Sequence, residues 1–130
     1  MSEFTTELDV VGLGFRVKKD AREALARIID KEGSIQGIQF EREPDNKHDD
    51  MAIKVLLPER MQDGLHIGYM RASAAARLAP LLDAGSIEFV QAALTSLDAE
   101  DGFKEGSMLV EIRDNRTSGK GAKAAPKPKR

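Results

Sequence analysis

The sequence predicts a mainly β protein with two helices (α+β), folded as a small, partly open six-stranded barrel that the helices decorate. Six short segments have the apolar runs or the alternation of β-strands, and two segments have helical periodicity. Short strands at such spacing usually close, or nearly close, on themselves. With 130 residues, 41% of them hydrophobic, the chain suits one compact domain with a single core.

The first strand and the first helix are predicted from residues 7–33. Residues 7–17 begin as an apolar run that Gly12 and Gly14 interrupt, which is typical of a buried strand with a bend or a close backbone approach. Residues 20–32 place alanine, leucine and isoleucine on one face at helical spacing, and Gly33 ends that pattern. We therefore expect an amphipathic helix between the first two strands.

The middle of the chain predicts three strands. Residues 34–43 alternate weakly, residues 51–57 alternate strongly, and residues 65–70 form another short apolar segment. The first two of these strands bracket a strongly polar stretch. That stretch is therefore the connection of a hairpin-like pair.

The last third of the chain predicts a helix and two strands. Residues 72–84 have a helical pattern that Gly85 ends, and Pro80 would remove the hydrogen bond to the carbonyl of Ala76, so we expect a kinked or split helix. The segments "SIEFVQAALTSL" and "SMLVEIRD" then read as the fifth and sixth strands.

Composition excludes several classes of protein. The chain has no cysteine, so disulfides, thiolate zinc sites and cysteine nucleophiles are excluded. It has no apolar run of the roughly 18 residues that a membrane helix needs and no pattern typical of a signal peptide. We therefore expect a cytoplasmic protein.

Charge divides the chain into an acidic body and a basic tail. Residues 114–130 carry a net charge of +5, which leaves −7 on residues 1–113. The tail has no apolar residue larger than alanine, so it cannot bury enough surface to order itself. We expect a domain over residues 1–113 and a disordered basic tail over 114–130, which either binds nucleic acid through phosphates or only adds solubility.

The polar stretch within "EREPDNKHDDMAIKV", residues 41–55, invites a metal hypothesis first. Its aspartates and His48 are ligands that Mg²⁺, Mn²⁺ or Zn²⁺ accept. However, a calcium loop would need a glycine and a terminal glutamate that "DNKHDD" does not supply. The spacing therefore gives metal binding little support, and we expect no cofactor.

Hydrolytic chemistry and phosphate cradling receive little support as well. Asp49 and Asp50 are adjacent, so in an extended chain they point to opposite faces and cannot share a proton. A nuclease would need an acid two places before Lys54, and none is there. Gly12 and Gly14 lack the third glycine of a phosphate-binding fingerprint.

A loop that shapes itself is the remaining interpretation of this stretch. Asn46 and Asp49 are three residues apart, the spacing at which a short side chain can bond backbone N–H groups of its own loop. The two residues then either only shape the loop or hold it in the form that recognises a ligand.

Three ordered blocks of the sequence resemble the HIRAN domain family. They are "VVGLGF" (10–15), "EREPDNKHDDMAIKV" (41–55) and "HIGYM" followed by "RASAAARLAPLLDAG" (66–85). The middle block is the specific one, and the residues that match its pattern are Arg42, Glu43, Pro44, Asn46, Asp49, Ala52, Ile53 and Val55. The resemblance covers roughly residues 8–113 and is closest to stand-alone members from bacteria or phages.

The resemblance implies a modified OB-like barrel that binds DNA. In fork-remodelling members, the domain binds the free 3′-hydroxyl end of single-stranded DNA: aromatic side chains hold the terminal bases, a loop aspartate contacts the hydroxyl, and basic residues contact phosphates. Other members are fused to helicase-like translocases and nucleases. By this resemblance, the present chain is similar to a DNA-binding module with helicase or nuclease partners.

Carried onto this sequence, the family pattern names eight DNA-binding residues. Asp49 takes the place of the hydroxyl-binding aspartate, and His48 stands where the loop aromatic would be. Asn46 shapes the loop or contacts a base. The remaining positions are the first aromatic and its neighbour, the strand-to-helix corner and the last turn, which hold Phe15, Arg16, Tyr69, Arg71 and Phe103.

The chain departs from the family pattern at positions that bear on affinity. Gly14 replaces a basic residue before the first aromatic, Ala72 replaces a lysine at the helix start, and the helix over 20–32 is longer than the usual connection. Together with the acidic body, these changes predict weak phosphate binding unless the tail contributes.

By this resemblance, we expect a non-catalytic module that recognises single-stranded DNA at 3′-hydroxyl ends, in repair, replication or restriction-related processes. A protein-interaction adaptor on the same fold and a metal-dependent nuclease are the alternatives.

Overall fold

The computed structural model describes residues 2–13, 17–61, 64–97 and 105–116. Three of the predicted DNA-binding residues, Phe15, Arg16 and Phe103, lie outside these residues, as does the chain from residue 117 onward. The predicted boundary at residue 113 falls inside the last strand, which continues to Asp114.

The described residues form one antiparallel sheet and two helices. The sheet has seven strands in the order β2-β6-β7-β1-β5-β4-β3. The elements are β1 (Ser2–Val11), α2 (Lys19–Glu32), β2 (Ile35–Gln36), β3 (Gln39–Arg42), β4 (Ile53–Leu56), β5 (His66–Met70), α3 (Ala72–Asp83), β6 (Ile87–Leu97) and β7 (Glu105–Asp114). The predicted class, mainly β with two helices, is confirmed.

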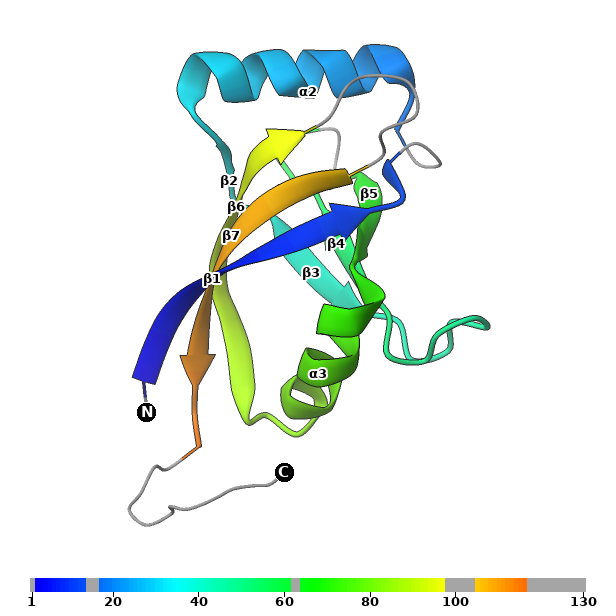
Figure 1. Ribbon diagram of the computed structural model, residues 1–130, viewed down its shortest axis with the longest axis vertical. Helices are drawn as coiled ribbons and strands as arrows, with labels where there is room; N and C mark the ends of the chain where they lie inside the picture. Colours follow the sequence, from blue (N-terminus) through cyan, green and yellow to red (C-terminus); the bar gives the residue numbers. More distant parts are fainter. Residues whose placement is uncertain (1, 14–16, 62–63, 98–104, 117–130) are drawn as a thin grey trace.

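The sheet curls into a half-barrel (Figure 1). Its long strands β1, β6 and β7 cross the molecule, α2 lies across one end and α3 lies near the other, while the loop between β3 and β4 projects from the body. The curl brings the two ends of the sheet together. The contact that shows this is between Phe40 of β3 and Phe89 of β6, whose ring centroids are 4.7 Å apart. This near-closure fits the predicted partly open barrel.

Gly37 explains why the sheet has seven strands where the sequence predicted six. The weakly alternating segment over residues 34–43 is not one strand, because Gly37 has a left-handed φ of 86° that turns the chain between β2 and β3. β2 pairs with β6, and β3 pairs with β4. The two halves of the predicted strand therefore lie at opposite ends of the sheet.

Two neighbouring long strands, β6 and β7, pair along most of their length. β6 and β7 have 11 and 10 residues, and β6 stays paired with β7 through two register shifts, one between Phe89 and Gln91 and one between Leu94 and Ser96. Each shift moves the following side chains to the other face of the sheet. Ile87, Ala92 and Leu94 can all be buried for this reason, although their spacing is not a simple alternation.

The helices pack on the sheet with their apolar faces. Leu25 and Ile29 of α2 and three alanines of α3, Ala74, Ala75 and Ala79, join the core that the sheet surrounds. Arg22, also buried, donates from Nη1 to the carbonyl oxygen of Val17 at 2.6 Å and so fixes the entry to α2. Neither helix of the described chain is long and apolar enough to cross a membrane.

We expected Pro80 to kink or split the second helix; the split is wrong, and the kink stays a prediction. α3 runs as one element from Ala72 to Asp83 with Pro80 inside it. Pro80 lies in the last turn, where its carbonyl oxygen still accepts from the N–H of Ala84 at 3.1 Å. The hydrogen bond that Pro80 cannot donate to Ala76 is therefore lost near the C-terminal end of α3, and the helix continues past Pro80.

Candidate nucleic-acid interface

The β3–β4 loop is held in shape by hydrogen bonds within it. β3 and β4 pair directly from Gln39↔Leu56 to Arg42↔Ile53, so the polar stretch is a hairpin connection, as predicted. The side-chain oxygen of Asn46 accepts from the N–H groups of His48 and Asp49, at 2.8 and 3.0 Å. The predicted turn-forming role of Asn46 is confirmed.

Glu43 connects this loop to the neighbouring strands. Its Oε1 accepts from Nδ2 of Asn46 at 2.6 Å and from the hydroxyl of Tyr69 at 2.8 Å, and its Oε2 lies 3.3 Å from Nζ of Lys54. The hydrogen bonds from Asn46 and Tyr69 are the largest causes that lower the pKa of Glu43, from 4.5 to about 2. Glu43 is thus a fixed carboxylate at which the loop, β4 and β5 meet.

Arg42 attaches the same loop to α3. Its guanidinium forms two hydrogen bonds with the carboxylate of Asp83, at 2.8 and 2.9 Å, and donates to the carbonyl oxygens of Ala52 and Asp50, at 2.7 and 2.9 Å. This bidentate pair raises the pKa of Arg42 and lowers that of Asp83. The loop is therefore anchored on two sides.

Tyr69 lies where the three sequence blocks converge. It pairs in register with Val11 at the end of β1, so the start of the first block lies beside it. Its hydroxyl reaches Glu43 in the second block, and its ring meets the ring of His66 edge-on, with centroids 4.8 Å apart. The fold thus brings the loop, β5 and the end of β1 together at one site.

Arg71, two residues after Tyr69, is surrounded by negative charge. Its Nε lies 3.0 Å from Oδ2 of Asp9, and its Nη2 lies 2.6 Å from Oε1 of Glu105. Both carboxylates raise the pKa of Arg71, and the hydrogen bond that Arg71 donates to Asp9 does so most strongly. The group formed by Asp9, Arg71 and Glu105, here called the Arg71 corner, carries a net charge of −1.

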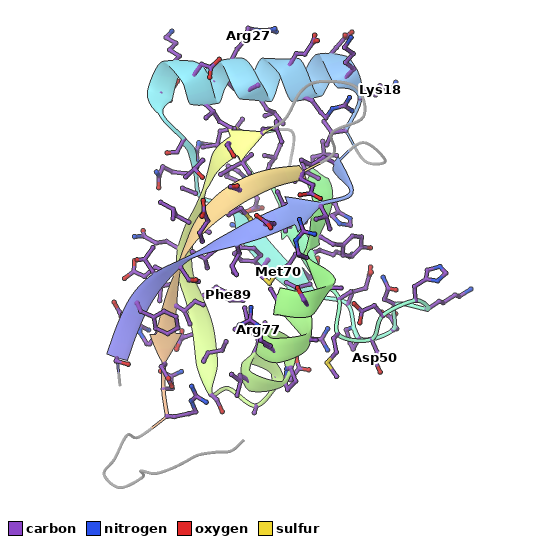
Figure 2. The ribbon with its side chains drawn as sticks, in the orientation of Figure 1. Lys18, Arg27, Asp50, Met70, Arg77 and Phe89 are labelled. Carbon is purple, nitrogen blue, oxygen red and sulfur yellow. The ribbon has the colours of Figure 1, made fainter. Side chains whose placement is uncertain are left out.

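The predicted hydroxyl acceptor, Asp49, is half-buried within the loop. Its Oδ1 accepts from the N–H of Met51 at 2.9 Å, and no described residue donates to its second oxygen. His48 is exposed, and only its backbone N–H is bonded among the contacts of the described residues. Asp50, which directly follows Asp49, lies on the part of the loop that projects from the body (Figure 2).

The loop does not form a metal site among the described residues. No group of three or more histidine, aspartate or glutamate side chains there has an arrangement that could hold an ion. The carboxylates of the stretch do not converge on one point. Glu43 and Asp49 accept hydrogen bonds from their own loop, whereas Asp45 and Asp50 are exposed.

The geometry defines an OB-like half-barrel with a braced hairpin loop beside an aromatic residue. The family model of the HIRAN domain matches residues 5–108, so the chain belongs to the HIRAN domain family. No curated protein sequence matches the chain.

Two solved structures have a similar fold. The HIRAN domain of human HLTF is 20% identical, with a TM-score of 0.52 over 82% of this chain and 74% of that one. A protein from Lactobacillus plantarum is 18% identical, with a TM-score of 0.53 over 86% of this chain and all of that one. At these identities the likeness concerns the fold.

Three residues of the site were not singled out from the sequence. Arg42 and Glu43 were recognised only as matches to the family pattern, and Lys54 only as a strand residue that a nuclease motif would need. Two adjacent opposite charges immediately before Pro44 were the available signal, because charged residues at a loop entry often bond the loop's own backbone.

Proposed function

We propose that this protein is a non-catalytic DNA-binding module that recognises the 3′-hydroxyl end of single-stranded DNA. The observation that carries the proposal is the Glu43–Tyr69–Asn46 network, which holds the Asp49 loop beside Tyr69 and the end of β1. Membership of the HIRAN domain family supports DNA as the ligand.

The residue types of the site suit an unphosphorylated end. Tyr69 offers an aromatic face for a base, and stacking contributes about 1–3 kcal/mol per base whatever the sequence. Asp49 offers a carboxylate oxygen to the terminal hydroxyl, whereas a terminal phosphate would bring like charge next to Asp49. End recognition therefore follows from the pairing of one aromatic with one acceptor.

Phosphate contacts are the weak part of this interface. The Arg71 corner is net negative, and residues 1–113 carry a charge of −7. We infer that residues 114–130, with a charge of +5, supply much of the sequence-independent attraction to DNA. A helicase or nuclease partner would bring the module to its DNA.

The test compares two single-stranded oligonucleotides that differ only in a 3′-hydroxyl or a 3′-phosphate, by fluorescence anisotropy at low salt. The protein should bind the hydroxyl end about tenfold more tightly, since a hydrogen bond to a charged group contributes roughly 1.5 kcal/mol. Asp49→Ala should remove most of this difference, and Phe15→Ala should weaken binding to both.

The matched control is Asp45→Ala, which removes an exposed carboxylate from the same loop. It should leave the preference for the hydroxyl end unchanged. Equal affinity of the unmodified protein for the two ends would overturn end recognition, and undetectable DNA binding at low salt would favour a protein-interaction adaptor. Cleavage that depends on Mg²⁺ or Mn²⁺ would instead favour a nuclease.

A further inference from the structure

We propose that Arg42 and Glu43 are the positioning residues of the DNA-contacting loop, which they hold from opposite faces of β3 without touching DNA themselves. This inference rests on the proposed function, because it concerns how the same loop presents Asp49.

The two residues reach different parts of the fold because neighbouring side chains of a strand point to opposite faces. Arg42, with a side chain 14% exposed, reaches Asp83 at the end of α3. Glu43, with a side chain 22% exposed, reaches Tyr69 of β5 and Lys54 of β4. The last residue of β3 and the next one thus attach the loop to three separate elements.

Each of the two residues also holds a different half of the loop. Glu43 binds Asn46 through both its carboxylate and its carbonyl oxygen. Asn46 in turn accepts from the amides of His48 and Asp49. Arg42 binds the carbonyl oxygens of Asp50 and Ala52 in the second half. Asp49 stands between the two halves, so its position depends on both.

The charges of this arrangement are compensated within it. Glu43 faces Lys54, and Arg42 faces Asp83, so neither of these partly shielded side chains stays an isolated charge. Charge-assisted hydrogen bonds of this kind are stronger and more directional than neutral ones. They can therefore fix a loop whose middle residues are exposed to solvent.

The test uses Glu43→Gln and Arg42→Lys. Glutamine keeps the length of the side chain but loses the charge, and lysine keeps the charge but cannot form the two-point contact with Asp83. Amide hydrogen exchange of His48, Asp49 and Ala52, measured by NMR without DNA, should become about tenfold faster in both variants. The preference for a 3′-hydroxyl over a 3′-phosphate should fall about threefold.

Glu41→Gln is the matched control, because it removes the same charge two residues earlier in the chain. Glu41 has a side chain 60% exposed and lies 4.0 Å from Lys54 without any contact to the loop among the described residues. Exchange and preference should both stay as in the unmodified protein. A second variant, Asp83→Asn, weakens the anchor on α3 without changing the loop and should shift both readouts in the direction of Arg42→Lys.

Two outcomes decide the inference. If exchange accelerates while the preference for the hydroxyl end stays the same, the two residues stabilise the loop but do not position Asp49, and the inference is wrong. If the unmodified protein has no preference while exchange still accelerates in the variants, end recognition fails and the anchoring of the loop stands.

Discussion

Glu43 and the Arg71 corner lie on either side of Tyr69 and use charge in opposite ways. At Glu43, one carboxylate is surrounded by donors from Asn46, Tyr69 and Lys54. At the corner, one guanidinium is surrounded by the carboxylates of Asp9 and Glu105. The first arrangement satisfies a negative charge, whereas the second leaves a negative charge in excess.

Glu43 and the Arg71 corner also differ in how exposed they are to a ligand. Glu43 is 22% exposed and its bonds run inside the fold, so DNA has little access to it. Arg71 is 42% exposed, as is its partner Asp9, so a phosphate could compete for the guanidinium. Under the proposed function, the loop is held in place before DNA binds, while the net negative charge of the Arg71 corner opposes the phosphates.

The largest expected effect comes from a substitution in β5, the strand that carries Tyr69 between Glu43 and the Arg71 corner. A Cβ at Gly68 would lie 2.4 Å from the carbonyl oxygen of Val11 and 3.0 Å from Cγ2 of Val10. Gly68→Ala should therefore force β1 and β5 apart, lower the free energy of unfolding by about 3 kcal/mol and abolish DNA binding. Urea unfolding and anisotropy measure the two losses.

Gly33→Ala separates the steric effect from the effect of backbone conformation. Gly33 has a φ of 91° and nothing within 4 Å of an added Cβ. Its substitution should cost only about 1 kcal/mol, through the left-handed backbone, and leave DNA binding intact. A similar cost for both variants would mean that β1 and β5 are not held as closely as the structure has them.

The second effect concerns the corner and is a gain of affinity. Asp9→Asn and Glu105→Gln each release Arg71 from one carboxylate, so each should tighten DNA binding about threefold at low salt, the order expected for exposed ion pairs. The dependence of affinity on salt should become steeper, because one more cation is free for a phosphate.

Glu7→Gln is the matched control for the corner, since Glu7 is an exposed carboxylate on the same strand as Asp9. Glu7→Gln changes the net charge by the same amount as Asp9→Asn. Glu7 lies two residues before Asp9 on the same face of β1, so it is further along the strand from Arg71. Equal gains from Glu7→Gln and Asp9→Asn would attribute the effect to overall charge and contradict the role of the corner.

The smallest effect is the dependence of stability on pH. Because folding lowers the pKa of Glu43 from 4.5 to about 2, the ionised carboxylate stabilises the fold above pH 4.5, and this contribution is lost as the pH falls toward 2. Glu43→Gln should therefore lose less stability than the unmodified protein across that range. The urea midpoint, followed with pH at constant ionic strength, measures this difference, and a parallel decline in both proteins would contradict it.

The sequence was informative wherever the determining contacts are local. The hairpin around the loop, the role of Asn46 and the end of α2 at Gly33 involve residues close together in the chain. The positions of Phe15, Arg16 and Phe103 stay predictions, since these residues lie outside the described chain. The roles of His48 and Asp49 in binding DNA stay predictions as well.

Long-range contacts could not be predicted from one sequence. Glu43 meets Tyr69 across 26 residues, and Arg71 meets Asp9 across 62. Periodicity gives the face on which such residues lie but not the partner on another strand. The two shifts in β6 and the turn at Gly37 break the alternation on which strand assignment depends. Only the turn at Gly37 changed the number of strands, because it divides one predicted strand into β2 and β3.

The pairing of β1 with β7 has a consequence for how the protein is made. Ser2 pairs with Asp114, so the two strands at the middle of the sheet come from opposite ends of the described chain. During synthesis, β1 is made long before β7, because Val11 pairs with Glu105 and Ser2 with Asp114. Until β7 is made, the edges of β1 and β6 that pair with it have unpaired backbone groups and are open to pairing with other chains.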